Sequence, residues 1–283
     1  MTNLPRSPLS WALVALLSCI ALPAQRGGAG GQGAQGGPGG GRGFGPSEAI
    51  LGRMGTYFVD VTLSEQMLFK GMNGLAETTL VKSASKDGHL SLLYLFDPRT
   101  DKRKHENFES LMFRAPSNIA IALRYYKCGR VDLSQDEMAR GMFGKKSPMF
   151  VAFNEKGKVA GNASMKGYKG KPRVLVALVT RAAKTFAKGK VQLPKFVKQY
   201  RNFLNDYMLY EGKQRTLQNK MARLAKKGTI PVAKKAKLDK DTAALVALEK
   251  KLLKAEKKLL DRAKLPVRDE KATRIGDRRR GRR

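Results

Sequence analysis

The chain has 283 residues and a formal net charge of +33, because 56 lysines and arginines outnumber 23 aspartates and glutamates. The hydrophobic share of 42% is sufficient for a core, which excludes a wholly disordered chain. A charge of this size repels itself unless anions neutralise it, so the composition predicts a partner with an acidic surface. The length suits one or two domains.

Residues 1–24 are predicted to be an export signal. Arg6 precedes an apolar run at residues 11–22, which is short for a membrane span. Such a signal places the protein in the periplasm, in the cell envelope or outside the cell. Two alternatives remain open: an uncleaved N-terminal anchor, and a lipoprotein box at residues 16–19 in which Cys19 carries lipid.

The cysteines and histidines limit the possible chemistry. The chain contains only Cys19, Cys128, His89 and His105. Because Cys19 leaves with the signal or carries lipid, Cys128 is expected to be a lone thiol without an intramolecular disulfide. One cysteine and two histidines are too few for a zinc-type cluster. We therefore expect no metal ion and no cofactor, and no residue pattern points to a small-molecule substrate.

Composition divides the rest of the chain into four parts. Residues 25–46 are dominated by glycine and are predicted to be a flexible linker. Residues 47–190 are predicted to form an α/β domain, and residues 191–266 a basic helical hairpin. Residues 267–283 are predicted to be a disordered polybasic tail.

Strands and helices are predicted to alternate in the α/β domain. Strands are expected at residues 57–61, 90–96, 125–133, 149–153 and from Val159, and helices at 75–85, from Phe108, at 119–123, from Ser134 to Gly144 and at 171–186. Residues 90–96 are apolar almost throughout, which suits a strand covered on both faces. The alternation predicts a layered α/β fold with a sheet sandwiched by helices.

Two of these helices have more detailed predictions. Ser134 with Glu137 fits a capping box, in which a serine caps the helix and a glutamate lies three residues later. The helix at 171–186 is expected to turn an apolar stripe inward. That stripe consists of Val174, Leu175, Leu178, Val179 and Ala182.

The series of elements resembles the thioredoxin-like family over residues 74–188. Residues 90–96 resemble the central strand before the family's active-site turn, and residues 125–133 resemble the next strand. Pro148 resembles the cis-proline that opens the family's third core strand, and residues 154–158 resemble its hairpin, with Gly157 free to take positive φ. The resemblance implies that Ser147 and Pro148 edge a peptide-binding groove. The alternative is that Pro148 only shapes the turn.

The resemblance also shows which residues of the family's redox motif this chain lacks. Thioredoxin-like oxidoreductases carry Cys-x-x-Cys at a helix N-terminus, where the helix dipole stabilises a thiolate. Here Lys102 and His105 fall near the cysteine positions, and neither can exchange disulfides. We therefore expect a redox-inactive domain, with His105 in a solvated basic loop. A rival hypothesis is a divergent oxidoreductase that uses Cys128, against the simpler interpretation of Cys128 as a small buried residue on a strand.

The C-terminal part predicts two heptad helices joined by a turn near residues 228–231. The first seam includes Phe196, Tyr200, Phe203, Tyr207 and Tyr210, and the second includes Leu245, Leu248, Leu252, Ala255 and Leu259. Asp239 or Asp241 is expected to cap the second helix. The seams must be buried against each other, the domain or a second chain, so an oligomer is also possible.

Lysines and arginines dominate the outer faces of these helices and the end of the chain. The polybasic tip consists of Arg278, Arg279, Arg280, Arg282 and Arg283. We expect these charges to dock to a protein, an anionic envelope polymer or a lipid surface. Nucleic acid is an alternative partner. The simplest alternative is that the charges only keep a solvent-exposed face hydrated. The expected function is that of an exported binding or scaffolding module in the cell envelope.

Overall fold

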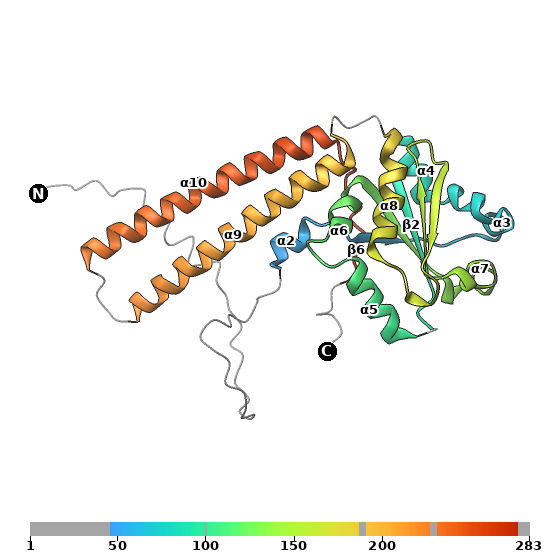
Figure 1. The fold of residues 1–283 in the computed structure, drawn as a ribbon, viewed down its shortest axis with the longest axis horizontal. Coiled ribbons are helices and arrows are strands. Elements are labelled where there is room, and N and C mark those ends of the chain that lie inside the picture. The colour runs from blue at the N-terminus through green and yellow to red at the C-terminus, as the bar shows by residue number, and fades with distance from the viewer. Residues whose placement is uncertain (1–45, 100, 187–190, 227–230, 277–283) are drawn as a thin grey trace, which may run out of the picture. The chain divides into compact units, whose positions relative to one another are not determined.

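The computed structural model describes residues 46–99, 101–186, 191–226 and 231–276 (Figure 1). The predicted export signal, Cys19, nearly all of the glycine-rich linker and the polybasic tip at 278–283 lie outside these residues. Within the described ranges, no helix combines the length and apolarity needed to cross a membrane.

The fold is mixed α/β and contains a six-stranded sheet in the order β5-β4-β2-β3-β1-β6. The strands are β1 (Tyr57–Asp60), β2 (Leu90–Phe96), β3 (Tyr126–Asp132), β4 (Met149–Phe153), β5 (Val159–Ser164) and β6 (Thr273–Arg274). Strand β3 runs parallel to both of its neighbours, β1 and β2. Strand β4 runs antiparallel to β2, β5 antiparallel to β4, and β6 antiparallel to β1.

Helices cover both faces of this sheet, as the sequence predicts (Figure 1). The helices are α2 (Glu48–Gly52), α3 (Glu65–Phe69), α4 (Thr79–Lys86), α5 (Lys102–Met112), α6 (Asn118–Ala122), α7 (Glu137–Phe143), α8 (Pro172–Ala182), α9 (Leu193–Ala225) and α10 (Val232–Ala263). Short 3₁₀ turns lie at Gly71–Glu77, Leu123–Tyr125, Leu133–Gln135, Gly144–Lys146, Lys166–Tyr168 and Ala183–Thr185.

The side chains of β2 explain the two layers. All seven of its residues are buried, and neighbouring side chains on a strand point to opposite faces. Tyr94 packs in the cluster that includes α5, α6, α8 and α9, whereas Leu93 and Leu95 pack in the cluster that includes α3, α4 and α7. The predicted doubly covered strand is thereby confirmed.

The stretch from Pro148 to β5 also follows the prediction. Strand β4 has the predicted bounds, Pro148 precedes it, and the Ser147–Pro148 peptide bond is cis. The Oδ1 atom of Asn154 accepts hydrogen bonds from the amides of Lys156 and Lys158, each 3.0 Å long. Gly157 takes a φ of +72° in this turn, which a residue without Cβ adopts without steric cost.

Two details of the predicted helices are wrong. Asp136, not Ser134, caps α7, because its Oδ1 accepts from the amide of Ala139 at 3.0 Å. Ser134 instead lies in a 3₁₀ turn, where its own amide donates to Asp132 at 2.9 Å. In α8 the side chain of Val174 is 42% exposed, so it does not belong to the inward stripe.

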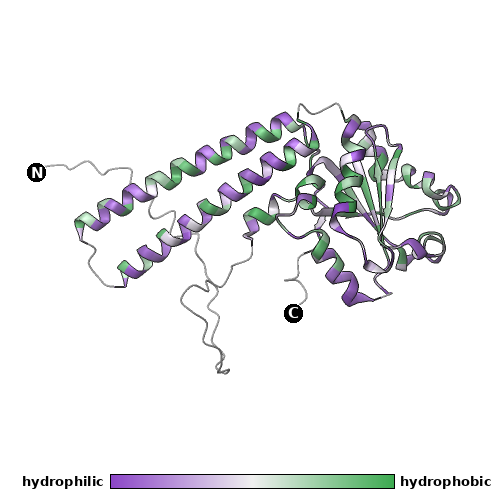
Figure 2. Ribbon diagram, viewed as in Figure 1, coloured by the Kyte–Doolittle hydropathy of each residue, from purple (hydrophilic) through white to green (hydrophobic). Residues whose placement is uncertain are grey.

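The two long C-terminal helices pack on each other and on the sheet domain. The hydroxyl of Tyr200 donates to Glu256 at 2.8 Å, and Lys220 pairs with Asp241 at 3.8 Å. Since early α9 meets late α10 and late α9 meets early α10, the helices run in opposite directions. Figure 2 shows hydrophilic and hydrophobic residues interspersed along both. The five aromatic residues of the predicted first seam are buried. Helix α10 begins at Val232, so the predicted caps Asp239 and Asp241 lie inside it.

Residues 267–276 contradict the predicted disordered tail. Thr273 pairs with Phe58 and Arg274 with Tyr57, which adds β6 to the sheet. The amide of Ile275 donates to the carbonyl of Thr56 at 3.0 Å. A strand of two residues within a charged segment has too little apolar periodicity to be recognised from sequence.

Candidate functional site

The end of the sheet where β2 stops and β4 starts brings together the residues that the family resemblance singles out. Leu95 pairs with Met149, so Ser147 and Pro148 lie beside Phe96. Pro148 is buried, and its carbonyl accepts from the amide of Met165 at 2.7 Å. This burial favours the interpretation in which Pro148 shapes the turn over the one in which it edges a peptide-binding groove.

The prediction that His105 lies in a solvated loop is wrong. His105 lies on the inner face of α5. It is 8% exposed, and its ring stacks on Phe96 with 4.9 Å between ring centroids. Its Nε2 atom lies 3.3 Å from Oε1 of Glu109, and its Nδ1 atom lies 3.5 Å from the hydroxyl of Tyr94. His105 shares a helix face with Phe108 and Met112, three and seven residues later, which places it inward.

Lys102 separates from His105 on the same helix. Lys102 is the first residue of α5 and is exposed. The helix is capped by Asp101, whose Oδ1 accepts from the amide of Lys104 at 2.9 Å. The structure therefore brings His105 to the end of β2 but leaves Lys102 at the surface.

Tyr168 covers the cluster formed by His105 and Phe108, and no sequence pattern pointed to it. Its hydroxyl donates to the carbonyl of Asp97 at 2.6 Å. Its ring meets those of His105 and Phe108 edge-on, at centroid distances of 5.8 and 5.7 Å. Burial, with a contribution from the negative charge of Asp97, raises the pKa of Tyr168 to about 12. The phenol therefore stays neutral and acts here as a hydrogen-bond donor that closes the sheet end.

Cys128 lies on β3, as predicted, away from that cluster. It pairs with Leu92 in the register, three positions before the Leu95–Met149 pair next to Pro148. Its side chain is 5% exposed, and burial raises the pKa of the thiol. A thiol that remains protonated is a poor nucleophile, so the geometry favours the simple interpretation of a small buried residue.

The buried thiol predicts a specific loss of stability in alkali. Unfolding returns Cys128 to its ordinary pKa of 9.0, below the folded value, so its contribution is fully present below this pKa and declines as pH rises through it. Between about pH 8 and about pH 10, the wild type should lose about 1.4 kcal/mol more unfolding free energy than Cys128→Ala. Urea unfolding of both proteins at each pH checks this, and equal losses would contradict it.

The described part of the basic C-terminal region contains a hollow between the end of α9 and the start of α10. We call it the cationic cleft, and its volume is about 1000 Å³. It is lined by Thr216, Asn219, Lys220, Arg223, Leu224, Lys226, Lys234 and Lys237. Of its five cations, Lys220 pairs with Asp241 at 3.8 Å. The described lining residues include no carboxylate, so positive charge predominates in the cleft.

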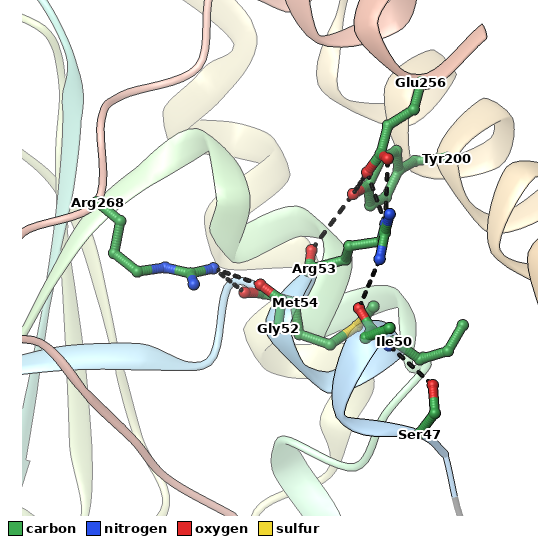
Figure 3. A network of polar contacts seen from close by, with 9 residues as sticks. Ser47, Ile50, Gly52, Arg53, Met54, Tyr200, Glu256 and Arg268 are labelled. Carbon is green, nitrogen blue, oxygen red and sulfur yellow. Dashed lines mark hydrogen bonds and ion pairs between the residues drawn. The ribbon is translucent and has the colours of Figure 1, made fainter. Parts of the chain in front are cut away.

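A polar network anchors these helices to the sheet domain (Figure 3). The Nε atom of Arg53 lies 3.0 and 3.1 Å from the two carboxylate oxygens of Glu256. Arg53 also donates to the carbonyl of Ala49 at 2.9 Å, and its guanidinium lies 4.3 Å from the centre of the Tyr207 ring. Burial opposes the charge on Arg53, but the carboxylate of Glu256 outweighs it, so the pKa of Arg53 is raised.

These features define a mixed α/β protein whose helix-covered sheet carries two long basic helices. In the described ranges, no group of three histidine, cysteine, aspartate or glutamate residues is placed to hold a metal ion. No protein-family model matches the chain, and no curated protein matches it.

Proposed function

We propose that the chain is an exported, redox-inactive thioredoxin-like protein that binds an anionic lipid surface of the cell envelope through its C-terminal helices. The arrangement of the sheet supports the thioredoxin-like part of this proposal. The three strands that carry the resemblance, β3, β2 and β4, are neighbours in that order. The cis Pro148 lies directly before β4, and the helix after β2 begins at Lys102.

The redox-inactive part rests on what occupies the family's reactive positions. Lys102 and His105, in the first turn of α5, stand near the positions where the family has thiols. Cys128 is buried in another part of the sheet, with a raised pKa. Thiol–disulfide exchange needs an accessible thiolate, so a binding role fits the chain better than the rival oxidoreductase.

The cationic cleft is the observation that carries the binding part of the proposal. Among the described residues, five cations gather where the two helices meet, and no carboxylate joins them in the lining. A cation near an anionic lipid surface contributes about 1 kcal/mol. The proposed helical hairpin would present this surface at a distance from the sheet. The polybasic tip, from Arg278 to Arg283, adds further positive charge along the sequence.

Reversing three charges of the cleft should weaken binding to anionic vesicles. We expect Arg223→Glu, Lys234→Glu and Lys237→Glu together to lower the affinity roughly a hundredfold or more, since three contributions of about 1 kcal/mol are lost. Co-sedimentation with vesicles of neutral lipid, with and without an anionic lipid, measures this. Raising the salt concentration should weaken wild-type binding in the same assay.

A charge-matched control distinguishes the cleft from net charge. The triple variant Lys156→Glu, Lys158→Glu and Lys166→Glu changes three exposed lysines of the sheet domain and should retain most of the affinity. Equal losses in the two triple variants would refute a specific role for the cleft. Binding to single-stranded DNA that exceeds binding to anionic vesicles would favour a nucleic-acid partner instead.

A further inference from the structure

A second hollow lies beside the outer part of the sheet. It is formed by α4, the strands β1 and β3, and the segment after α10, and its volume is about 900 Å³. We call it the arginine groove. Its charged lining consists of Arg124, Lys127, Arg268 and Lys271, with Asp60 and Asp269. It shares no lining residue with the cationic cleft.

Arg268 is held in this groove by neutral groups. One of its terminal nitrogens donates to the carbonyls of Gly52 and Met54, each at 2.9 Å (Figure 3). Its guanidinium carbon lies 3.6 Å from the centre of the Tyr57 ring. Carbonyls and an aromatic face fix the position of a guanidinium but leave its full charge. The groove therefore contains a fixed cation.

A second arginine lines the same groove. Arg124 belongs to the 3₁₀ turn Leu123–Tyr125 and lines the same groove. Burial, and then the positive charge of Arg124, lower the pKa of Arg268. Both arginines line this groove, so their positive charges add there. Among the residues that the structure describes, neither one forms an ion pair with a carboxylate.

The neighbouring carboxylates are engaged elsewhere. Asp60 pairs with Arg130 at 2.5 Å, and Lys127 pairs with Asp87 at 2.5 Å. The Oδ1 atom of Asp269 accepts from the amide of Lys271 at 2.8 Å. Outside the described ranges the sequence contains a single acidic residue, Asp277. None of these contacts pairs a carboxylate with Arg124 or Arg268.

We propose that the arginine groove binds a phosphate group, either as free phosphate or as a small phosphate monoester. Guanidinium N–H groups donate charge-assisted hydrogen bonds to phosphate oxygens. Arg268 keeps its Nε–H and its other terminal nitrogen as donors, because only one terminal nitrogen is held by the carbonyls of Gly52 and Met54. A phosphate monoester carries between about 1.5 and 2 negative charges at neutral pH, which balances two neighbouring cations better than one carboxylate does. This site lies outside the surface proposed above for lipid binding and does not depend on it.

Isothermal titration of the full chain with inorganic phosphate, glycerol phosphate and acetate, at equal ionic strength, tests the proposal. We expect both phosphates to bind and acetate to bind more weakly. Arg124→Gln and Arg268→Gln should each lower phosphate affinity roughly tenfold or more, because each loses a charge-assisted contact. Arg268→Lys keeps the charge but loses the planar guanidinium and the donors that hold it on the two carbonyls, so its affinity should fall between those of the wild type and Arg268→Gln.

The control variant is Arg173→Gln, which removes one exposed arginine from α8, a helix that packs on β4 and β5 at the other end of the sheet. It should bind phosphate as the wild type does. Within the described residues, the side chain of Arg124 makes no hydrogen bond. Arg124→Gln is therefore expected to keep the fold, and circular dichroism verifies this. Equal phosphate affinity in Arg124→Gln and Arg173→Gln, binding of acetate as tight as that of phosphate, or no binding of either phosphate to the wild type would overturn the proposal. Tighter binding of glycerol phosphate than of inorganic phosphate identifies the ligand as a monoester, and equal binding identifies the phosphate group alone.

Discussion

Replacing Gly55 with alanine is expected to lower the free energy of unfolding by about 3 kcal/mol, because the new methyl group meets backbone that cannot move independently. A Cβ at this position would lie 2.2 Å from the amide nitrogen of Arg124 and 2.3 Å from the carbonyl carbon of Leu123. The amide of Gly55 also donates to the carbonyl of Ala120 at 2.6 Å. Two chain segments are therefore in direct contact here, and thermal or urea unfolding measures the cost of separating them.

Gly52 provides the control for this substitution. It lies three residues earlier, at the last position of α2, and a Cβ added there would meet nothing within 4 Å. Since alanine favours helix more than glycine does, Gly52→Ala should leave stability unchanged or slightly raise it. If the two substitutions have the same effect on the unfolding midpoint, the backbone of Gly55 does not lie as close to Leu123 and Arg124 as the structure shows.

The substitution Glu256→Gln is expected to lower the free energy of unfolding by about 3 kcal/mol, because it leaves Arg53 charged and without its partner. The side chains of Arg53 and Glu256 are 19% and 11% exposed, so water replaces little of the lost attraction. Tyr200 loses a charged acceptor at the same time. Urea unfolding measures the loss, and circular dichroism shows whether the two long helices unfold before the sheet.

Glu137→Gln is the matched control, because it removes the same charge from an exposed pair. The side chains of Glu137 and Arg140 are 89% and 43% exposed. Such pairs contribute at most about 1 kcal/mol. A loss of stability as small for Glu256→Gln as for Glu137→Gln would show that the Arg53–Glu256 pair does not anchor the helices.

Local patterns predicted the elements of the fold that are buried along their whole length. Strands β2 and β4 are short apolar runs between turn residues, and the covered sheet follows from them. The partner of each buried cation could not be predicted in the same way. Arg53 and Glu256 are 203 positions apart, and a guanidinium that bonds to a distant carboxylate has no local signature.

The candidate site shows the same division. The lone Cys128 was placed on the correct strand, because it lies inside the stretch 125–133, which was predicted to be a strand. His105 was misplaced, since the surrounding lysines and arginines resemble a solvated loop, whereas Phe108 and Met112 turn it inward on a helix. The arginine groove was missed, because Arg124 and Arg268 meet only after two long helices return the chain to the sheet.

Strand β6 has a consequence for the chain during its synthesis. It follows α10 in sequence but pairs with β1, near the start of the described residues. Until residue 273 has emerged from the ribosome, the outer margin of β1 has no strand beside it, and unpaired margins recruit strands from other molecules. Strand β6 thus protects the edge of β1 from pairing with other chains. A premature stop codon or proteolytic cleavage before residue 273 would leave β1 as an unpaired edge strand that promotes aggregation.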